Sequence, residues 1–168
     1  MDTAVIDLVL RAAHFAAGIV WVGHNYANVA QRPRWQPVTR AELVDPTNPG
    51  FMARLNREHG LFRWAAVVTW LAGLCLLWRR EWLVQALTLQ GGLAGIGIGA
   101  WIGTAMMLNV WFVLWPHQKK VLGFVPASVD ERMRCARITF LSSRTNTMLS
   151  IPLLVLMASS HHGALLTG

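Results

Sequence analysis

The chain alternates long apolar runs with short polar segments, which is the pattern of helices that cross a membrane. The predicted helices cover about residues 4–29, 61–78, 83–115 and 128–160. A helix needs roughly 20 predominantly apolar residues to cross a bilayer, and the four runs are close to this length or longer. We therefore predict an all-α integral membrane protein, a four-transmembrane-helix bundle that forms a single membrane domain over residues 1–168.

The polar segments between these runs differ in character. Residues 31–60 are polar and hold four prolines, so we expect mostly loop there. Residues 78–82 read Trp-Arg-Arg-Glu-Trp and predict a tight turn. Residues 128–131 read Ser-Val-Asp-Glu, a capping box, so the last helix is expected to begin near Ser128.

Composition supports a membrane protein and argues against a soluble enzyme. Hydrophobic residues make up 54% of the chain and charged residues only 14%, whereas soluble domains carry about 25% charged residues. Nine tryptophans suit membrane interfaces, where an indole ring is buried while its N–H stays hydrated. The net charge of +7 does not indicate nucleic-acid binding, because the basic residues flank the apolar runs.

Basic residues are distributed unequally between the two sides of the predicted bundle. Two of them lie in the turn after the second helix, and twelve lie in or beside the segments that follow the first and third helices. The twelve are Arg32, Arg34, Arg40, Arg54, Arg57, Arg63, Lys119, Lys120, Arg132, Arg134, Arg137 and Arg144. Because Lys and Arg favour the cytoplasmic side, we predict a multi-pass protein of the bacterial inner membrane, with residues 31–60 cytoplasmic and both termini periplasmic.

The first predicted helix carries ionisable residues along one face, which includes Asp7, Arg11, His14 and Trp21. Asp7 and Arg11 are four residues apart and are expected to pair. His14 lies near the middle of the bilayer, where it either hydrogen-bonds a neighbouring helix or binds the iron of a haem. In the second case Arg11 would bind a haem propionate.

The remaining histidines fall into two groups. His24, His59 and His117 lie at the cytoplasmic ends of three helices, where they either hold a metal ion or stay apart as interfacial side chains. His161 lies at the outer end of the last helix and is the candidate second iron ligand beside His14. The depths estimated for His14 and His161 differ by roughly 10 Å, unless the last helix is shifted inward.

A row of glycines follows one face of the third helix, at positions 91, 95, 99 and 103. Small residues at this spacing allow close helix packing in lipid, and they also leave room for a flat macrocycle. Near the cytoplasmic ends of the third and fourth helices, Asn109, Arg144, Thr145 and Asn146 are either interfacial side chains or a small polar pocket. Such a pocket would take an anionic or heteroaromatic ligand.

The two cysteines, Cys75 and Cys135, are expected to lie on opposite sides of the membrane and not to pair. The sequence has no Cys-x-x-Cys-His, so it encodes no covalently attached haem.

Three segments carry a resemblance to a known family. Residues 12–24 (AAHFAAGIVWVGH), 109–123 (NVWFVLWPHQKKVLG) and 143–152 (SRTNTMLSIP) resemble the membrane domain of the bacterial cytochrome c-type urate hydroxylase. The resemblance implies a membrane-bound redox domain that oxidises urate, or a similar heteroaromatic, and passes electrons to an external cytochrome. The positions it carries over are His14, His161, Asn109, Arg144, Thr145 and Asn146.

The expected cofactor is therefore haem b, and the expected partners are the lipid bilayer and a membrane protein or cytochrome, with a homo-oligomer as another option. Two alternatives remain open at this stage. The chain is alternatively a noncatalytic small transmembrane subunit of a respiratory or photosynthetic complex, whose helices pack on partners and pigments. It is otherwise a metal-handling membrane protein that uses the cytoplasmic histidines.

Overall fold

The computed structural model describes residues 2–31, 39–44 and 49–159, and within these ranges it contains helices and no strands. Their bounds are α1 (Thr3–Gln31), α2 (Arg40–Val44), α3 (Pro49–Arg79), α4 (Leu83–Leu87), α5 (Ala94–Leu108), α6 (Trp115–Val121) and α7 (Val129–Ser159). A 3₁₀ turn, η1 (Gly91–Leu93), precedes α5, and a π-helical segment, η2 (Asn109–Leu114), joins α5 to α6. The all-α prediction is confirmed.

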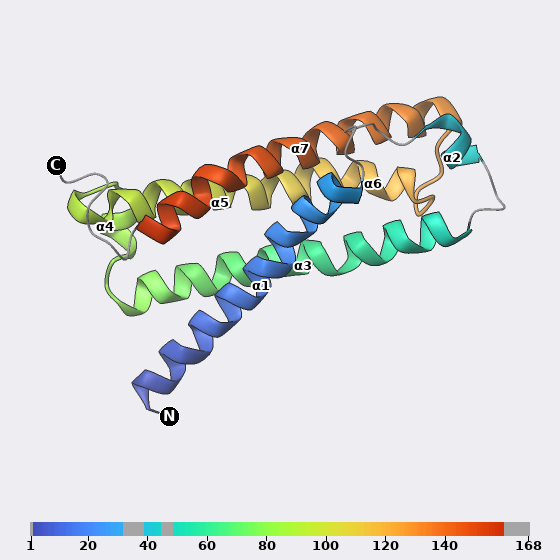
Figure 1. Cartoon of the computed structure of the whole chain (residues 1–168). Coiled ribbons are helices and arrows are strands. Elements are labelled where there is room, and N and C mark those ends of the chain that lie inside the picture. Colours follow the sequence, from blue (N-terminus) through green and yellow to red (C-terminus); the bar gives the residue numbers. More distant parts are fainter. Residues whose placement is uncertain (1, 32–38, 45–48, 160–168) are drawn as a thin grey trace.

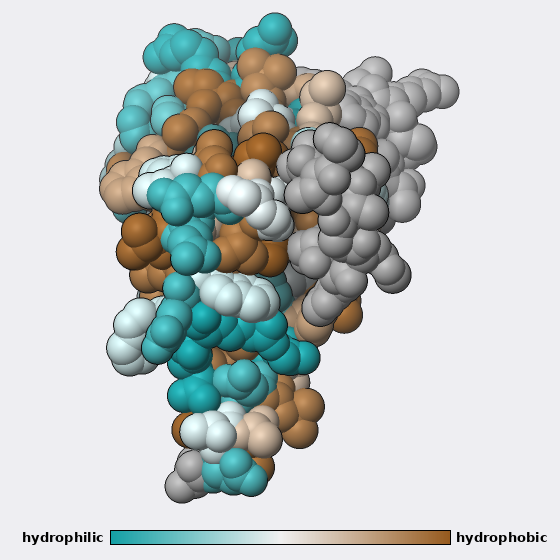
Figure 2. All heavy atoms as spheres, turned by 90° about the vertical axis from the view of Figure 1, so that its left-hand side faces the viewer, coloured by the Kyte–Doolittle hydropathy of each residue, from teal (hydrophilic) through white to brown (hydrophobic). Residues whose placement is uncertain are grey.

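The long helices α3, α5 and α7 run side by side, and α1 crosses them obliquely (Figure 1). The first turn of α1, the last turn of α3, α4 and the last turn of α7 lie toward one end, called here the α4 end. The first turns of α3 and α7 lie at the opposite end together with α2 and α6, called here the α2 end. Seen from the α4 end, hydrophilic and hydrophobic residues lie beside each other on the surface (Figure 2).

Three stretches in the described ranges are long and apolar enough to cross a membrane, namely Thr3–Ala27, Gly60–Arg79 and Gly91–Val121. The first two correspond to the predicted helices over residues 4–29 and 61–78, and the third overlaps the predicted helix over 83–115 but is shifted toward the C-terminus. The helix α7 is long enough but not apolar enough, so the fourth span is not confirmed by composition. Its hydropathy is lowered in part by polar residues such as Ser142, Asn146 and Ser150, which are buried in the protein.

The predicted loop and the predicted start of the second long helix are wrong in the segment that follows α1. Residues 31–60 are not mostly loop: α2 lies within them, and α3 begins at Pro49 rather than at residue 61. Proline suits the first position of a helix because its missing N–H would have no partner there. The prolines that predicted a loop therefore mark, at residue 49, the start of a longer helix.

The predicted helix over residues 83–115 is also wrong as a single element. It breaks after Leu87 and resumes at Gly91, and both Leu89 and Gly91 adopt positive φ, at 59° and 53°. Beyond Leu108 the chain continues through η2 and α6 to Val121. Pro116 has no N–H to donate to the preceding turn, and we attribute the wider winding of η2 to it.

The helices pack around one main apolar core. Trp21, Phe62, Ala66, Met106 and Val110 are its most deeply buried members, contributed by α1, α3, α5 and η2. A smaller cluster at the α2 end joins α2 and α6 to α7. The two cysteines are free, with one exposed on α3 and the other buried on α7, so the prediction that they do not pair is confirmed.

The start of α7 agrees with the capping box. The Glu131 N–H donates to Ser128 Oγ over 3.2 Å, so Ser128 caps the helix as predicted. The Glu131 side chain does not close the box but accepts from Lys120 Nζ at 2.5 Å. Nearby, Arg40 of α2 pairs with Asp130 at 2.6 Å. These ion pairs tie α2 and α6 to the first turn of α7.

Candidate functional site

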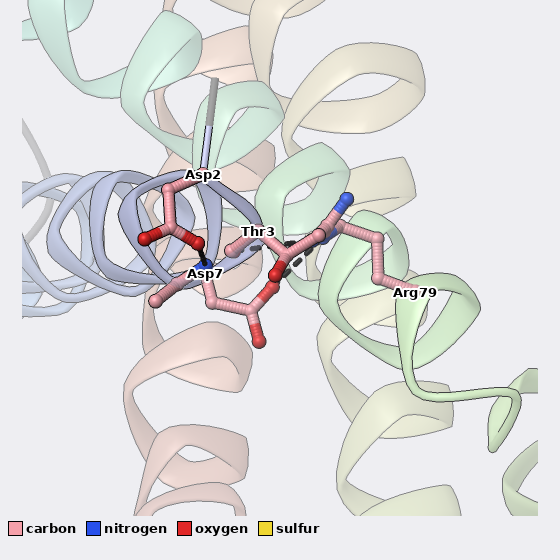
Figure 3. A network of polar contacts seen from close by, with 5 residues as sticks. Asp2, Thr3, Asp7 and Arg79 are labelled. Carbon is pink, nitrogen blue, oxygen red and sulfur yellow. Dashed lines mark hydrogen bonds and ion pairs between the residues drawn. The ribbon is translucent and has the colours of Figure 1, made fainter.

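The ionisable face of α1 contacts α3 at the α4 end. Arg79 Nε donates to Asp7 Oδ1 over 2.7 Å, and Arg79 Nη2 donates to the Thr3 carbonyl over 3.2 Å (Figure 3). The predicted Asp7–Arg11 pair is therefore wrong. Arg11 is exposed on α1, whereas the crossing of α1 and α3 brings Arg79 against the carboxylate. The pair also neutralises one of the two basic residues on the side predicted to be periplasmic.

His14 is held against α3 by a hydrogen bond across the helices. Its Nδ1 lies 2.8 Å from the Thr69 carbonyl oxygen. A carbonyl can only accept, so Nδ1 carries a proton, and in a neutral ring the lone pair is on Nε2. The ring packs on Gly73, where a Cβ would come within 2.9 Å of His14 Cε1. The hydrogen bond to α3 therefore engages Nδ1 and not Nε2.

The orientation of His14 fits an iron ligand. Metal-binding histidines commonly donate their other ring N–H to a carbonyl or carboxylate, which fixes the tautomer and the plane of the ring. The Thr69 carbonyl provides this support, and Gly73 leaves the space that the ring needs. His161, the candidate second ligand, lies outside the described residues.

The glycine row does not supply a flat gap beside His14. At Gly99 an added Cβ would lie 2.7 Å from Met157 Cε, and at Gly103 it would lie 4.0 Å from Leu153 Cδ1. Side chains of α7 therefore pack against Gly99 and Gly103, whereas an added Cβ at Gly91 would meet nothing within 4 Å. Gly91 lies outside α5, in η1.

Two amide side chains, one buried and one partly buried, link α5 and η2 to α7. Asn109 Nδ2 donates to Asn146 Oδ1 over 2.8 Å and to the Ser142 carbonyl over 3.0 Å. Ser142 Oγ returns a hydrogen bond to Asn109 Oδ1 over 2.9 Å, and Asn146 Nδ2 donates to the Met106 carbonyl over 3.2 Å. Asn109 and Asn146, predicted as neighbours in a polar pocket, are thus in direct contact.

The other two predicted pocket residues lie differently. Thr145 is exposed and donates to the Leu141 carbonyl of its own helix, because one residue along α7 turns the side chain by about 100° away from that of Asn146. It does not join the amide network. Arg144 is buried, and its Cζ lies 4.9 Å from the Phe140 ring centroid.

Two buried residues of α1 were missed by the sequence analysis as site candidates. Trp21 and Asn25 are 2% and 1% exposed. Neither Trp21 Nε1 nor Asn25 Nδ2 has a hydrogen-bond acceptor within the described ranges. Asn25 continues the spacing of His14 and Trp21 along one helix face, and this polar residue on an otherwise buried face was the available signal.

Next to Asn25, Tyr26 connects α1 directly to α7. Its hydroxyl lies 3.2 Å from Ser150 Oγ, and Ser150 Oγ in turn donates to the Thr147 carbonyl over 2.7 Å. The α1 donors and the α7 amides therefore border the same packed interior.

The histidines predicted to lie at the cytoplasmic side make separate contacts. His24 stacks on Phe62 with ring centroids 4.6 Å apart, and His117 Nδ1 donates to the Val113 carbonyl over 2.6 Å. The side chain of His59 lies outside the described residues. Among the residues that the structure describes, no three His, Cys, Asp or Glu side chains come together as a metal site.

Taken together, the interior offers two chemically different places. One is an imidazole whose Nε2 can coordinate a metal, fixed on α3. The other is the contact of η2 with α7, where Asn109 and Asn146 hydrogen-bond, and the neighbouring α1 adds the buried donors of Trp21 and Asn25. A planar heteroaromatic molecule presents both acceptor and donor atoms on its edge, so this second set suits such a ligand.

A comparison with family models identifies the chain. A model described as urate oxidase N-terminal matches residues 81–168, slightly more than half of the chain. The match covers α4 to α7, and therefore Asn109, Arg144 and Asn146, whereas His14 lies outside it. No match was found among curated proteins or among solved structures. The family predicted from the three sequence segments is confirmed: the chain belongs to the urate oxidase N-terminal family.

Proposed function

We propose that this protein is a membrane-embedded redox protein of the urate hydroxylase type, in which His14 binds a b haem. The observation that carries the proposal is the hydrogen bond from His14 Nδ1 to the Thr69 carbonyl, which presents Nε2 as an iron ligand would be presented. The chain's family membership supports urate, or a similar heteroaromatic, as the electron donor.

The proposed setting is the bacterial inner membrane, crossed four times, with both termini periplasmic. Three apolar helices support it by composition. The contact between Thr3 and Arg79, together with the position of the last turn of α7 at the same end, supports an antiparallel order of the four helices (Figure 1). In this setting α7 is the fourth span, and its polar residues are accommodated because they face other helices.

The residues proposed to hold the haem are His14 and, as second ligand, His161. Arg11, one turn from His14 and exposed, is proposed to bind a propionate. Bound haem would supply a one-electron carrier within the bilayer. The Thr69 carbonyl keeps the proton of His14 on Nδ1. Residue 73 is a glycine, so no side chain there displaces the ring.

The substrate is proposed to bind where α1, η2 and α7 meet. Asn109 and Asn146 are positioned by their mutual hydrogen bond, and Arg144 provides the positive charge for an anionic substrate. Trp21 and Asn25 hold buried N–H groups that the acceptors of a heteroaromatic ring would satisfy. Trp21 lies about 10 Å from His14 along α1, so substrate and haem would occupy neighbouring levels. An external cytochrome is the proposed acceptor.

Absorption spectroscopy of protein purified from haem-replete cells tests the proposal. The wild type should show a Soret band that sharpens on reduction, and His14→Ala should lose it while staying monodisperse. The matched control is His117→Ala, because the hydrogen bond of the His117 ring goes to the carbonyl of Val113, four residues earlier in the chain. Urate added without oxygen should reduce the haem, and Asn146→Leu should slow that reduction.

A colourless wild type would overturn the redox proposal and would favour the noncatalytic subunit instead. Retention of the Soret band in His14→Ala would contradict the assigned ligand.

A further inference from the structure

An arginine and three tryptophans gather where α3 meets η2 and α6, away from His14. The Cζ atom of Arg63 lies 3.7 Å from the ring centroid of Trp115 and 6.0 Å from that of Trp64. The rings of Trp64 and Trp111 meet edge to face with centroids 5.1 Å apart. These four residues are called the Arg63 cluster below.

The cluster holds buried donors that have no acceptor among the residues the structure describes. Arg63 Nε, Arg63 Nη1 and Trp111 Nε1 are buried and have no acceptor within the described part of the chain. Nor does Arg63 have a carboxylate partner among the residues the structure describes, where the ion pairs join Arg40 to Asp130, Arg79 to Asp7, and Lys120 to Glu131.

Arg63 is partly buried as a residue, with Nε and Nη1 out of contact with solvent. A cation partly withdrawn from water is stabilised by a counterion. Stacking on Trp115 stabilises the cation but supplies no acceptor for its N–H groups. Several N–H donors on two side chains suit an anion with several oxygens. A phosphate group has this chemistry, and water would satisfy the donors without balancing the charge.

The surroundings favour a phosphate that arrives with acyl chains. One wall of the cluster, Trp64, is 55% exposed and lies in an exposed apolar row of α3 with Leu61 and Val68. Phe112, next to Trp111, is 73% exposed. Arg63 lies three residues inside the apolar stretch that begins at Gly60, about 4.5 Å along the helix. In the membrane placement proposed above, this level is close to the headgroup boundary, and it is flanked by exposed apolar surfaces that acyl chains would cover.

We propose that the Arg63 cluster binds the phosphate of an anionic phospholipid headgroup, on the side of the membrane occupied by the α2 end. The proposal rests on the membrane placement proposed above but does not depend on haem or on urate. In it Arg63 supplies the charge and Trp111 Nε1 adds a hydrogen bond. Trp64 and Trp115 enclose the guanidinium and keep water away from it.

The test measures binding of dioleoylphosphatidylglycerol to the full chain in detergent by native mass spectrometry, with dioleoylphosphatidylcholine as the neutral reference. Wild type should bind one phosphatidylglycerol about tenfold more tightly than phosphatidylcholine, as expected for charge-assisted hydrogen bonds. Arg63→Gln should remove this preference. Trp111→Phe, which keeps an aromatic ring and loses only the N–H, should weaken it about threefold.

The matched control is Arg80→Gln. Arg80 also stacks on a tryptophan, Trp82, at 5.0 Å, but it lies at the α4 end and has no buried orphan donor. This variant should keep the wild-type preference. Arg63→Lys keeps the charge but loses the planar donor set, so it should fall between wild type and Arg63→Gln.

Equal phosphatidylglycerol binding by wild type and Arg63→Gln would overturn the proposal, as would displacement of the lipid by millimolar inorganic phosphate, which would identify a soluble anion as the occupant. If Arg63→Gln fails to fold, Trp111→Phe alone decides the outcome. Haem content of the same samples separates this proposal from the redox function, and alkaline carbonate extraction of membranes checks the membrane placement.

Discussion

At the scale of single residues, the interior is organised by polar side chains whose hydrogen bonds have few alternatives. Asn146 is fully buried and both accepts from Asn109 and donates to the Met106 carbonyl. In an apolar interior such groups cannot turn to water, so their geometry is well defined. Thr145, the next residue, is exposed and bonds only its own helix. The two neighbours therefore provide a matched pair for mutation.

Asn146→Leu should lower the free energy of unfolding by about 1–3 kcal/mol, because it leaves buried hydrogen-bonding groups of Asn109 and Met106 unsatisfied. Thr145→Ala should change it by less than about 0.5 kcal/mol, as expected for an exposed site. Thermal unfolding of detergent-solubilised protein measures both. Equal effects of the two substitutions would contradict the inward orientation of Asn146.

At the scale of elements, close approaches decide how the short helix α4 folds back on α5. A Cβ added at Gly97 would lie 1.8 Å from the backbone oxygen of Ala86, whereas at Gly92 nothing lies within 4 Å. Backbone cannot yield as a flexible side chain can. Gly97 is not a member of the predicted glycine row at 91, 95, 99 and 103. The close approach of α4 to α5 at Gly97 therefore lies outside that row.

Gly97→Ala should destabilise the protein by at least about 1–3 kcal/mol, because α4 must move away from α5 to admit the methyl group. Gly92→Ala is the control and should be close to neutral. The melting temperature and the proteolytic sensitivity of the segment between α4 and α5 report the difference. A Gly97→Ala variant as stable as Gly92→Ala would show that the two helices are not in this contact.

The contact between α1 and α3 at the α4 end rests on the partly exposed Asp7–Arg79 ion pair. A double-mutant cycle with Asp7→Asn and Arg79→Gln should give a favourable coupling energy that falls as salt is added, because the pair is accessible to solvent. The same cycle with Arg11→Gln in place of Arg79→Gln should give a smaller coupling energy, because Arg11 makes no hydrogen bond to Asp7 in the described structure. Coupling to Arg11 instead would restore the pair expected from helical spacing alone.

At the scale of the whole molecule, two ends with different charge follow from the antiparallel order of the helices. Most of the basic residues named for orientation belong to segments at or near the α2 end, while Arg79 at the α4 end is paired with Asp7. Because Arg79 is paired with Asp7, its positive charge favours a cytoplasmic location less strongly. The basic residues of the turn at 78–82 therefore argue less against a periplasmic location of that turn.

The orientation is tested with one new exposed cysteine at a time in a Cys75→Ser background, in which Cys135 is kept because it is buried. Gln90→Cys at the α4 end should react with a membrane-impermeant maleimide added outside intact spheroplasts, and Pro126→Cys at the α2 end should react only after permeabilisation. Both positions are exposed, and Cys135 is buried. The opposite labelling pattern would invert the proposed topology without affecting the fold.

The sequence by itself determined the helical class, three apolar spans, the cap at Ser128, the free cysteines and the family. These follow from local periodicity, from composition and from short motifs, which act within a few residues of chain. The tertiary structure decided what depends on residues far apart. It placed Arg79 rather than Arg11 on Asp7, oriented His14 through Thr69, brought Asn109 onto Asn146 and turned Thr145 away. It also left Asn25 Nδ2 buried with no acceptor among the described residues, and it broke the third helix near Leu87. Spacing along a helix shows which residues share a face, but only the packing of another helix determines what that face meets.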